Sequence, residues 1–171
     1  KKLVPIIHLP VQSGSNKILK LMNRKHTVEN YLSICKKLKK INSKIEFSSD
    51  FIIAYPGEKE KDFNETMKLI KKVKFINSYS FIFSPRPGTA ASNLKLIDES
   101  VAKERLKLVQ KELFDQQNLK NKTMKNKVVS VLVENKMVGQ NKFFGRTEYM
   151  TGVIFKGEQN IEGKIVPVLI T

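Results

Sequence analysis

Apolar residues in the first 97 positions fall into three short runs, each ending in a turn-rich segment. The runs cover residues 3–9, 45–54 and 79–83, and the first two lead into stretches with apolar residues at helical spacing. Thr27 is a good N-cap for one such helix, which we expect to run to about residue 41. Strands alternating with helices of this length predict parallel βα units, and therefore an α/β fold class.

A longer helical pattern follows, from about residue 98 to residue 121. Ala102, Leu106, Val109 and Leu113 repeat at four-three-four spacing and predict a single apolar stripe. The far end of this helix is polar, so we expect it to act as a strut that joins two bodies.

From Lys127 the pattern changes to a period of two, which is typical of β-strands. The expected strands cover residues 128–134, 143–150, 152–155 and 164–171. Short strands packed into about fifty residues predict a small antiparallel β-barrel. Pro167 cannot donate to a strand ladder, so its strand should be an edge there. We therefore divide the chain into residues 1–122 and 123–171.

Three loops at the ends of the predicted parallel strands are candidate sites, because folds of this kind bind ligands beyond the C-terminal strand ends. Gln12 in the first loop can donate and accept hydrogen bonds, and Arg86 in the third can clamp an anion. Each loop also has a structural interpretation. His8 is more often structural at a strand end, Asp50 can bond a neighbouring strand, and Arg86 can pin its own loop.

The net charge of +16 allows two interpretations. It can attract a nucleic acid, or it can reflect a compositional drift toward Lys and Asn. Only four of the 32 basic residues are arginines, so each arginine is informative. Arg24, Arg86 and Arg146 lie in motifs, whereas Arg105 is interpreted as incidental within a charged helix.

Cys35, the single cysteine, excludes an internal disulfide and any site that needs several cysteines. It lies on the apolar side of a helical pattern, which favours a buried thiol and fits a reducing, cytoplasmic setting. No apolar run reaches the length of a membrane-spanning helix.

Together, the loops HLPVQSGS, DFIIAYPGE and SPRPGTAA resemble, in order and spacing, the radical S-adenosylmethionine tRNA methylthiotransferases. The Leu-Pro-Val of the first loop and the Arg-Pro of the third favour the MiaB type, which modifies an isopentenylated adenosine beside the anticodon. Residues 21–24 and 145–147 extend the resemblance along essentially the whole chain, and the C-terminal part looks like a TRAM domain.

The resemblance implies an open six-unit parallel βα barrel with two four-iron–four-sulfur (4Fe-4S) clusters, of which this chain looks like units four to six. One S-adenosylmethionine would supply a methyl group, and another would supply a radical that activates carbon 2 of adenine. The chain has no Cys-x-x-x-Cys-x-x-Cys, so by itself it is expected to hold no cluster and to be inactive.

The resemblance also implies site residues. The S-adenosylmethionine pocket would be bordered by Gln12, Ser13, Ile52, Ile53 and Ala54, and Arg86 would border the reaction chamber. The family usually has Gly at position 54, where Ala is expected to crowd the loop. It usually has a capping Thr at position 59, where this chain has Lys.

The expected partner is a tRNA anticodon stem-loop, held by Lys142, Phe143, Phe144 and Arg146. These residues interleave basic and aromatic side chains, as a strip that stacks bases and grips phosphates would. The alternative is that every second residue packs inward, which leaves one Phe exposed.

Three other functions stay open. The chain could be a non-catalytic RNA-binding remnant, or it could pair with a separately encoded N-terminal half. It could also belong to a methylthiotransferase that acts on threonylcarbamoyl-adenosine.

Overall fold

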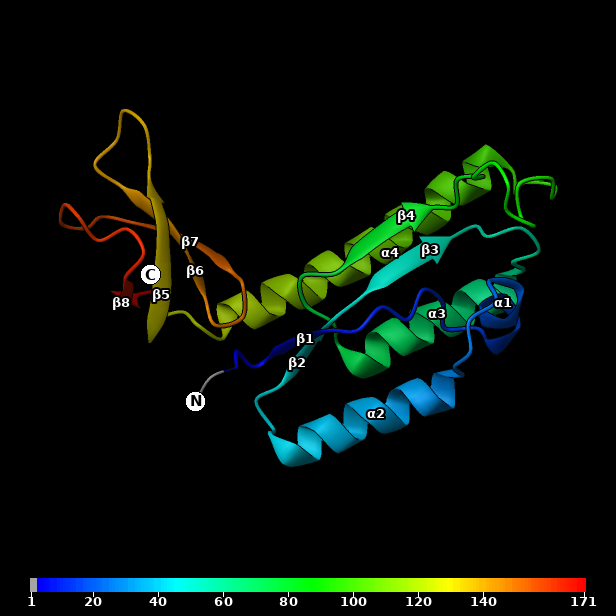
Figure 1. Cartoon of the computed structure of the whole chain (residues 1–171), viewed down its shortest axis with the longest axis horizontal. Helices are drawn as coiled ribbons and strands as arrows, with labels where there is room; N and C mark the ends of the chain where they lie inside the picture. The colour runs from blue at the N-terminus through cyan, green and yellow to red at the C-terminus, as the bar shows by residue number, and fades with distance from the viewer. Residues whose placement is uncertain (1–2) are drawn as a thin grey trace. The chain divides into compact units, whose positions relative to one another are not determined.

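The computed structural model describes residues 3–171 and divides into two compact units (Figure 1). The first unit comprises residues 7–117. The second comprises residues 118–171 together with the described N-terminal residues up to Ile6.

The first unit alternates strands and helices, as the apolar pattern predicts. Its elements are β1 (Ile6–His8), α1 (Asn16–Leu21), α2 (Val28–Ile41), β2 (Glu46–Ser48), β3 (Asp50–Ile53), α3 (Glu60–Val73), β4 (Tyr79–Ile82) and α4 (Glu99–Lys122). The first residue of β1 and the last turn of α4 are assigned to the second unit. β1 pairs with β2, and β3 pairs in parallel with β4 from Asp50–Tyr79 to Ile53–Ile82. A parallel bridge also joins Gln12 to Phe51. The α/β class with parallel pairing is therefore confirmed.

The predicted strand over residues 45–54 is broken at Ser49, which corrects the expectation of one continuous strand. The Ser49 hydroxyl donates to the Leu9 carbonyl at 3.0 Å and accepts from the Val11 amide at 3.0 Å. The Ser49 amide donates to the Ser78 hydroxyl at 2.9 Å. Because these groups bond to loops on both sides, the chain changes partner here, from β1 to β4.

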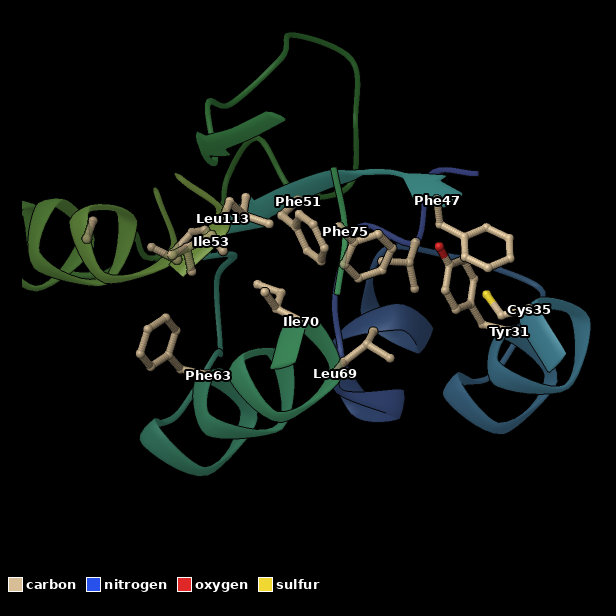
Figure 2. Close-up of a cluster of buried hydrophobic side chains, with 14 of the residues drawn as sticks. Tyr31, Cys35, Phe47, Phe51, Ile53, Phe63, Leu69, Ile70, Phe75 and Leu113 are labelled. Atoms are coloured by element: carbon tan, nitrogen blue, oxygen red, sulfur yellow. The ribbon is translucent and has the colours of Figure 1, made fainter. Parts of the chain in front are cut away.

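The core of the first unit lies between the strands and the helices (Figure 2). Phe51 and Ile53, on one face of β3, are completely buried, and the Phe51 ring meets Phe75 edge-on at 5.3 Å. Ile70 of α3 is also fully buried in this cluster. Cys35 of α2 joins it, so the prediction of a buried thiol is confirmed, and burial raises the pKa of that thiol.

The starts of α2 and α3 use different caps. The Thr27 hydroxyl accepts from the Asn30 amide at 3.2 Å, as predicted. At α3, Asp62 in the first turn accepts from the Lys59 amide at 2.9 Å. The missing Thr at position 59 is thus partly compensated by a carboxylate that reaches back to the cap.

The buried stripe of α4 differs from the prediction at one position. Ala102, Val109 and Leu113 are buried as expected, but the fourth buried residue is Arg105, while Leu106 is only partly covered. Arg105 is 7% exposed, so its interpretation as incidental is wrong.

Ala54 has a left-handed backbone with φ +59°, which explains why glycine suits this position better than alanine. Left-handed conformations cost an L-residue about 1–2 kcal/mol. We expect Ala54→Gly to raise the free energy of unfolding by about 1 kcal/mol, measured by urea denaturation. The control, Ala102→Gly in α4, should lower it by a similar amount. Equal losses in both variants would contradict this account.

The second unit contains an antiparallel sheet with the order β7-β6-β5-β8. Its strands are β5 (Val128–Lys136), β6 (Phe143–Thr147), β7 (Gly152–Phe155) and β8 (Ile165–Leu169). Within residues 3–171 no pairing joins β7 to β8, so the predicted barrel is confirmed only as a four-stranded sheet. β8 is an edge strand, as Pro167 predicts.

Strand alternation gives this sheet one buried face. Val131 and Val133 of β5, Phe143 of β6 and Val168 of β8 are buried. A Cβ on Gly145 would clash with the Leu132 carbonyl oxygen, so β6 approaches β5 more closely than a side chain there would allow. In the described part of the chain, no helix has the length and apolar character needed to span a membrane.

Candidate functional site

A cleft of about 650 Å³ lies in the first unit beside β3 and β4. Asp50 and Ile52 line it from the face of β3 opposite to the buried Phe51 and Ile53. The remaining lining comes from the first loop, the segment after α1, the loop after β3, β4 and the loop that follows β4: Gln12, Met22, Arg24, Tyr55, Phe81, Ile82, Phe83, Ser84, Arg86, Thr89 and Ala91. Parts of all three candidate loops therefore meet at one cleft.

Gln12 is held at the cleft by main-chain bonds. Its amide donates to the Asp50 carbonyl at 3.0 Å, and its carbonyl accepts from the Ile52 amide at 2.9 Å. Its φ of +73° is unusual for a residue with a side chain. A strained conformation held by the surrounding chain is a feature of functional loops.

Two exposed arginines give the cleft a cationic character. Among residues 3–171, neither Arg24 nor Arg86 has a carboxylate within ion-pair distance, although both line the cleft. Asp50 is 3.4 Å from the Nε2 atom of His8, whose Nδ1 atom is 2.9 Å from the Ser48 hydroxyl. The structural interpretations of His8 and Asp50 therefore match their contacts, while the arginines remain available to an anionic ligand.

Aromatic rings line the same cleft. The Tyr55 and Phe83 rings meet edge-on at 4.8 Å, and the Tyr55 hydroxyl donates to the Leu21 carbonyl at 3.1 Å. Phe81 is 56% exposed although it is a large apolar residue. Planar apolar walls beside free guanidinium groups suit a ligand that combines a ring with negative charge.

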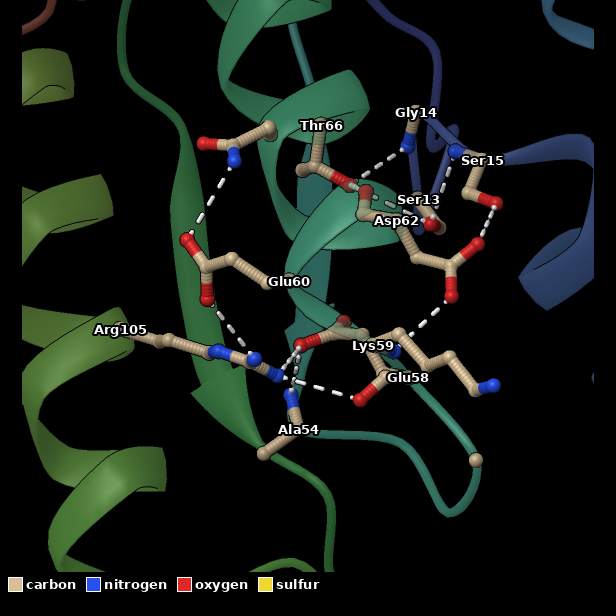
Figure 3. Close-up of polar contacts among 12 residues, drawn as sticks. Ser13, Gly14, Ser15, Ala54, Glu58, Lys59, Glu60, Asp62, Thr66 and Arg105 are labelled. Atoms are coloured by element: carbon tan, nitrogen blue, oxygen red, sulfur yellow. Dashed lines mark hydrogen bonds and ion pairs between the residues drawn. The ribbon is translucent and has the colours of Figure 1, made fainter.

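The rest of the first loop is clamped to α3 (Figure 3), and Ser13, Gly14 and Ser15 do not line this cleft. The Gly14 amide donates to the Thr66 hydroxyl at 2.9 Å, and the Ser15 hydroxyl donates to Asp62 at 2.8 Å. Asp62 is also paired with Lys17 at 2.8 Å. Burial opposes ionisation of Asp62, but the bonds from Lys17, Lys59 and Ser15 outweigh it and hold the pKa of Asp62 below its usual value.

A second clamp fixes the loop after β3 (Figure 3). Arg105 of α4 donates to the Glu58 carboxylate at 2.9 Å and to Glu60 at 3.0 Å. The same Glu58 oxygen accepts from the Ala54 amide at 3.2 Å. Burial raises the pKa of Glu58, and Arg105 acts against that rise. The path of the chain from Ala54 to Glu58, beside the cleft residue Tyr55, therefore depends on a buried ion pair.

The predicted cofactor-binding residues separate into two groups. Gln12 and Ile52 line the cleft, as does Arg86, which was predicted to border the reaction chamber. The Ser13 side chain is buried at 3.3 Å from the Thr66 hydroxyl, and Ile53 is a core residue, so neither side chain lines the cleft. Ala54 is also buried and borders the cleft only through its neighbours. Tyr55, Phe81 and Phe83 also line the cleft and were not predicted to do so, although Phe81 and Phe83 alternate along the third apolar run.

The predicted RNA strip is divided by the alternation of β6. Phe143 is completely buried, which corrects its placement on a binding surface. Lys142 is exposed, and Phe144 and Arg146 are partly exposed, with the Arg146 guanidinium 5.4 Å from the Phe144 ring. Arg146 also pairs with Glu134 at 2.9 Å. The alternative interpretation, with one Phe exposed, matches this arrangement.

The described residues can also be examined as ligands for an iron-sulfur cluster. Within residues 3–171 no group of three or more His, Cys, Asp or Glu side chains is placed to hold a metal ion, and Cys35 is buried in the core. The donor set of the described residues therefore does not fit a four-iron–four-sulfur cluster.

Comparison with known proteins gives one consistent result. A model of the radical SAM superfamily matches residues 1–70. The chain is 65% identical over 99% of its length to the tRNA-2-methylthio-N(6)-dimethylallyladenosine synthase of Pelagibacter ubique (strain HTCC1062). It is 49% identical over 99% of its length to the synthase of the same name in Wolbachia pipientis wMel, and 44% over 99% to that of Rickettsia akari (strain Hartford). The chain spans only 38–39% of the length of these relatives.

Proposed function

We propose that this chain, which is similar over 99% of its length to tRNA-2-methylthio-N(6)-dimethylallyladenosine synthases, forms part of a radical S-adenosylmethionine tRNA methylthiotransferase. The activity is the addition of a methylthio group to an isopentenylated adenosine next to the anticodon. The observation that carries the proposal is the 65% identity to a synthase named for that product, together with a cleft that joins the three motif loops.

In this proposal the first unit supplies three βα units of an open parallel barrel, within residues 1–122. The cleft then borders the S-adenosylmethionine pocket and the reaction chamber. Its lining fits such ligands, because Tyr55 and Phe83 offer aromatic surface and Arg24 and Arg86 offer charge for a carboxylate or phosphate. When bound, S-adenosylmethionine supplies the methyl group and the radical.

In this proposal Gln12 and the main chain of β3 at Ile52 orient the bound ligand. Gln12 is fixed to that strand by two main-chain hydrogen bonds, one of them from the Ile52 amide. The 4Fe-4S clusters implied by the family would be held by residues other than those described here.

Residues 123–171 are proposed to be a TRAM domain that contacts the anticodon stem-loop. Lys142, Phe144 and Arg146 lie on the open face of the sheet and can contact phosphates and bases. A tRNA substrate also favours a cytoplasmic location. A separately encoded N-terminal half is a candidate partner within this proposal.

The test replaces the matching portion of the Pelagibacter ubique synthase by this chain. After anaerobic cluster reconstitution, the chimera is given tRNA that carries either dimethylallyl-adenosine or threonylcarbamoyl-adenosine. We expect mass spectrometry to show a methylthio product on the dimethylallyl substrate alone. A folded, cluster-loaded chimera that modifies neither substrate would favour a non-catalytic RNA-binding role, and one that modifies only the threonylcarbamoyl substrate would change the family assignment.

A further inference from the structure

A second concave surface lies between α2 and α3, away from the cleft. Two hollows of about 720 and 540 Å³ adjoin there, since Glu29, Leu32 and Lys72 line both. We call this continuous surface the α2–α3 groove. Figure 1 shows α2 and α3 side by side in the first unit.

The α2–α3 groove and the cleft use opposite faces of β3. Phe51 and Ile53 point into the core that α2 and α3 cover, whereas Asp50 and Ile52 line the cleft. The groove is lined from the helices by residues such as Leu32 and Leu69. A ligand in the groove would therefore leave the cleft free.

Lysines dominate the charge of the groove. Seven of them line the two hollows, against three carboxylates, Glu29, Asp62 and Glu65. Lys17 is paired with Asp62, and Lys39 is paired with Glu46 at 3.1 Å. The other five have no carboxylate within ion-pair distance among residues 3–171: Lys36, Lys59, Lys61, Lys68 and Lys72.

The same chain provides an internal comparison. On the exposed surface of α4, Lys103 pairs with Glu99 at 2.6 Å and Lys111 with Asp115 at 2.7 Å. Lysines without a carboxylate partner among the described residues also occur elsewhere, such as Lys107 on α4, so the groove is distinguished by the gathering of five of them around one hollow rather than by their being unpaired. Unpaired cations gathered around a hollow repel one another unless a polyanion neutralises them.

Three of the unpaired lysines follow one side of α3. Lys61, Lys68 and Lys72 are separated along the helix axis by about 10 and 6 Å, at about 1.5 Å per residue. Long, flexible ammonium groups bind phosphates as point charges and place little demand on sequence. This arrangement suits successive phosphates of one strand.

We propose that the α2–α3 groove binds the phosphodiester backbone of RNA, independently of sequence and of the cleft. The proposal rests on the proposed function only in naming RNA as the polyanion. Neutralising each phosphate releases counterions, so the contribution of the groove should show in the salt dependence of binding.

The experiment measures the affinity of this chain for a tRNA transcript and for poly(U) over a range of KCl concentrations. The test variant is Lys61→Gln/Lys68→Gln/Lys72→Gln. The matched control, Lys103→Gln/Lys107→Gln/Lys111→Gln on α4, removes the same charge. Circular dichroism checks that both are folded, which we expect because these side chains are exposed.

For both RNAs, we expect the groove variant to reduce the slope of the logarithm of the binding constant against the logarithm of the KCl concentration by about 2. Each lost contact with a single-strand phosphate contributes about 0.7 to that slope. The affinity of the groove variant should fall about tenfold or more near physiological salt, and that of the control less than about threefold.

Equal losses in the two variants would overturn the proposal in favour of bulk charge. Unchanged RNA binding with lost binding to phosphatidylserine vesicles would overturn it in favour of a membrane surface. An inactive chimera would count against the proposed function, but the difference between these two variants would still decide the groove.

Discussion

Arg105→Ala is expected to lower the free energy of unfolding of the 7–117 unit by about 3–5 kcal/mol, because it leaves a buried carboxylate without its partner. The Glu58 side chain is 1% exposed, and Arg105 donates to it at 2.9 Å. Arg105 also lies over the Phe63 ring at 5.3 Å, so truncation removes packing as well as charge. Glu60, the second carboxylate, is 71% exposed and can be solvated by water, so it should contribute little.

The loss of stability in Arg105→Ala is expected to depend on pH through the Glu58 carboxyl. Burial raises the pKa of Glu58 above 4.5 in the folded protein, and removal of Arg105 should raise it further. A raised folded-state pKa means that stability is present at low pH and is lost as the pH rises through that pKa. Relative to the parent chain, Arg105→Ala should therefore become less destabilised as the pH falls from about 8 toward the unfolded value of 4.5.

The measurement is urea unfolding followed by circular dichroism at several pH values. The control is Arg105→Met combined with Glu58→Gln, which removes both charges and should recover most of the lost stability without the pH dependence. A loss below about 1 kcal/mol for Arg105→Ala, or a loss that does not vary with pH, would show that the ion pair is not what holds this loop.

Gly14→Ala is expected to lower the free energy of unfolding by about 3 kcal/mol through a backbone clash. A Cβ at this position would lie 2.5 Å from the Thr66 Cα atom and 2.6 Å from the Glu65 carbonyl oxygen. Both atoms belong to the main chain of α3, which cannot rotate away as a side chain can. The first loop would have to separate from α3, and the 2.9 Å bond from the Gly14 amide to Thr66 would lengthen or break.

Gly88→Ala is the matched control, because it tests conformational freedom without a clash. Gly88 has φ +79°, and a Cβ there would meet no atom within 4 Å, so its substitution should cost about 1 kcal/mol. Urea unfolding and amide exchange in α3 would separate the two effects. Equal losses, or unchanged exchange in α3 of Gly14→Ala, would contradict the close-approach explanation.

The order of elements in the 7–117 unit could be predicted from the sequence because it depends on local period and caps. The apolar spacing of α2 and its Thr27 cap are visible within a few residues. The break at Ser49 was not visible, since it depends on bonds to Leu9, Val11 and Ser78, which are distant in sequence. Likewise, strand alternation in the second unit is a local signal, whereas closure of a barrel depends on which edges meet.

Residue type alone was a partial guide to the candidate site. The three motif loops could be predicted to lie at one edge, and Gln12, Ile52 and Arg86 do line one cleft. Ser13 belongs to the same motif but turns toward Thr66, because Gly14 lets the loop press against α3. Because arginine is rare in this chain, Arg105 could have been singled out as a functional or structural residue. The neighbouring residues in the sequence do not show whether its guanidinium is buried or exposed.

The sequence by itself determined the α/β order, the antiparallel C-terminal strands and the similarity to tRNA-2-methylthio-N(6)-dimethylallyladenosine synthases, because periodicity and motifs are carried by neighbouring residues. The tertiary structure alone decided which polar residues became partners. Glu58 and Arg105 are 47 positions apart, as are Ser15 and Asp62. Their bonds depend on how helices pack against strands, and the direction of each side chain follows from that packing rather than from its residue type.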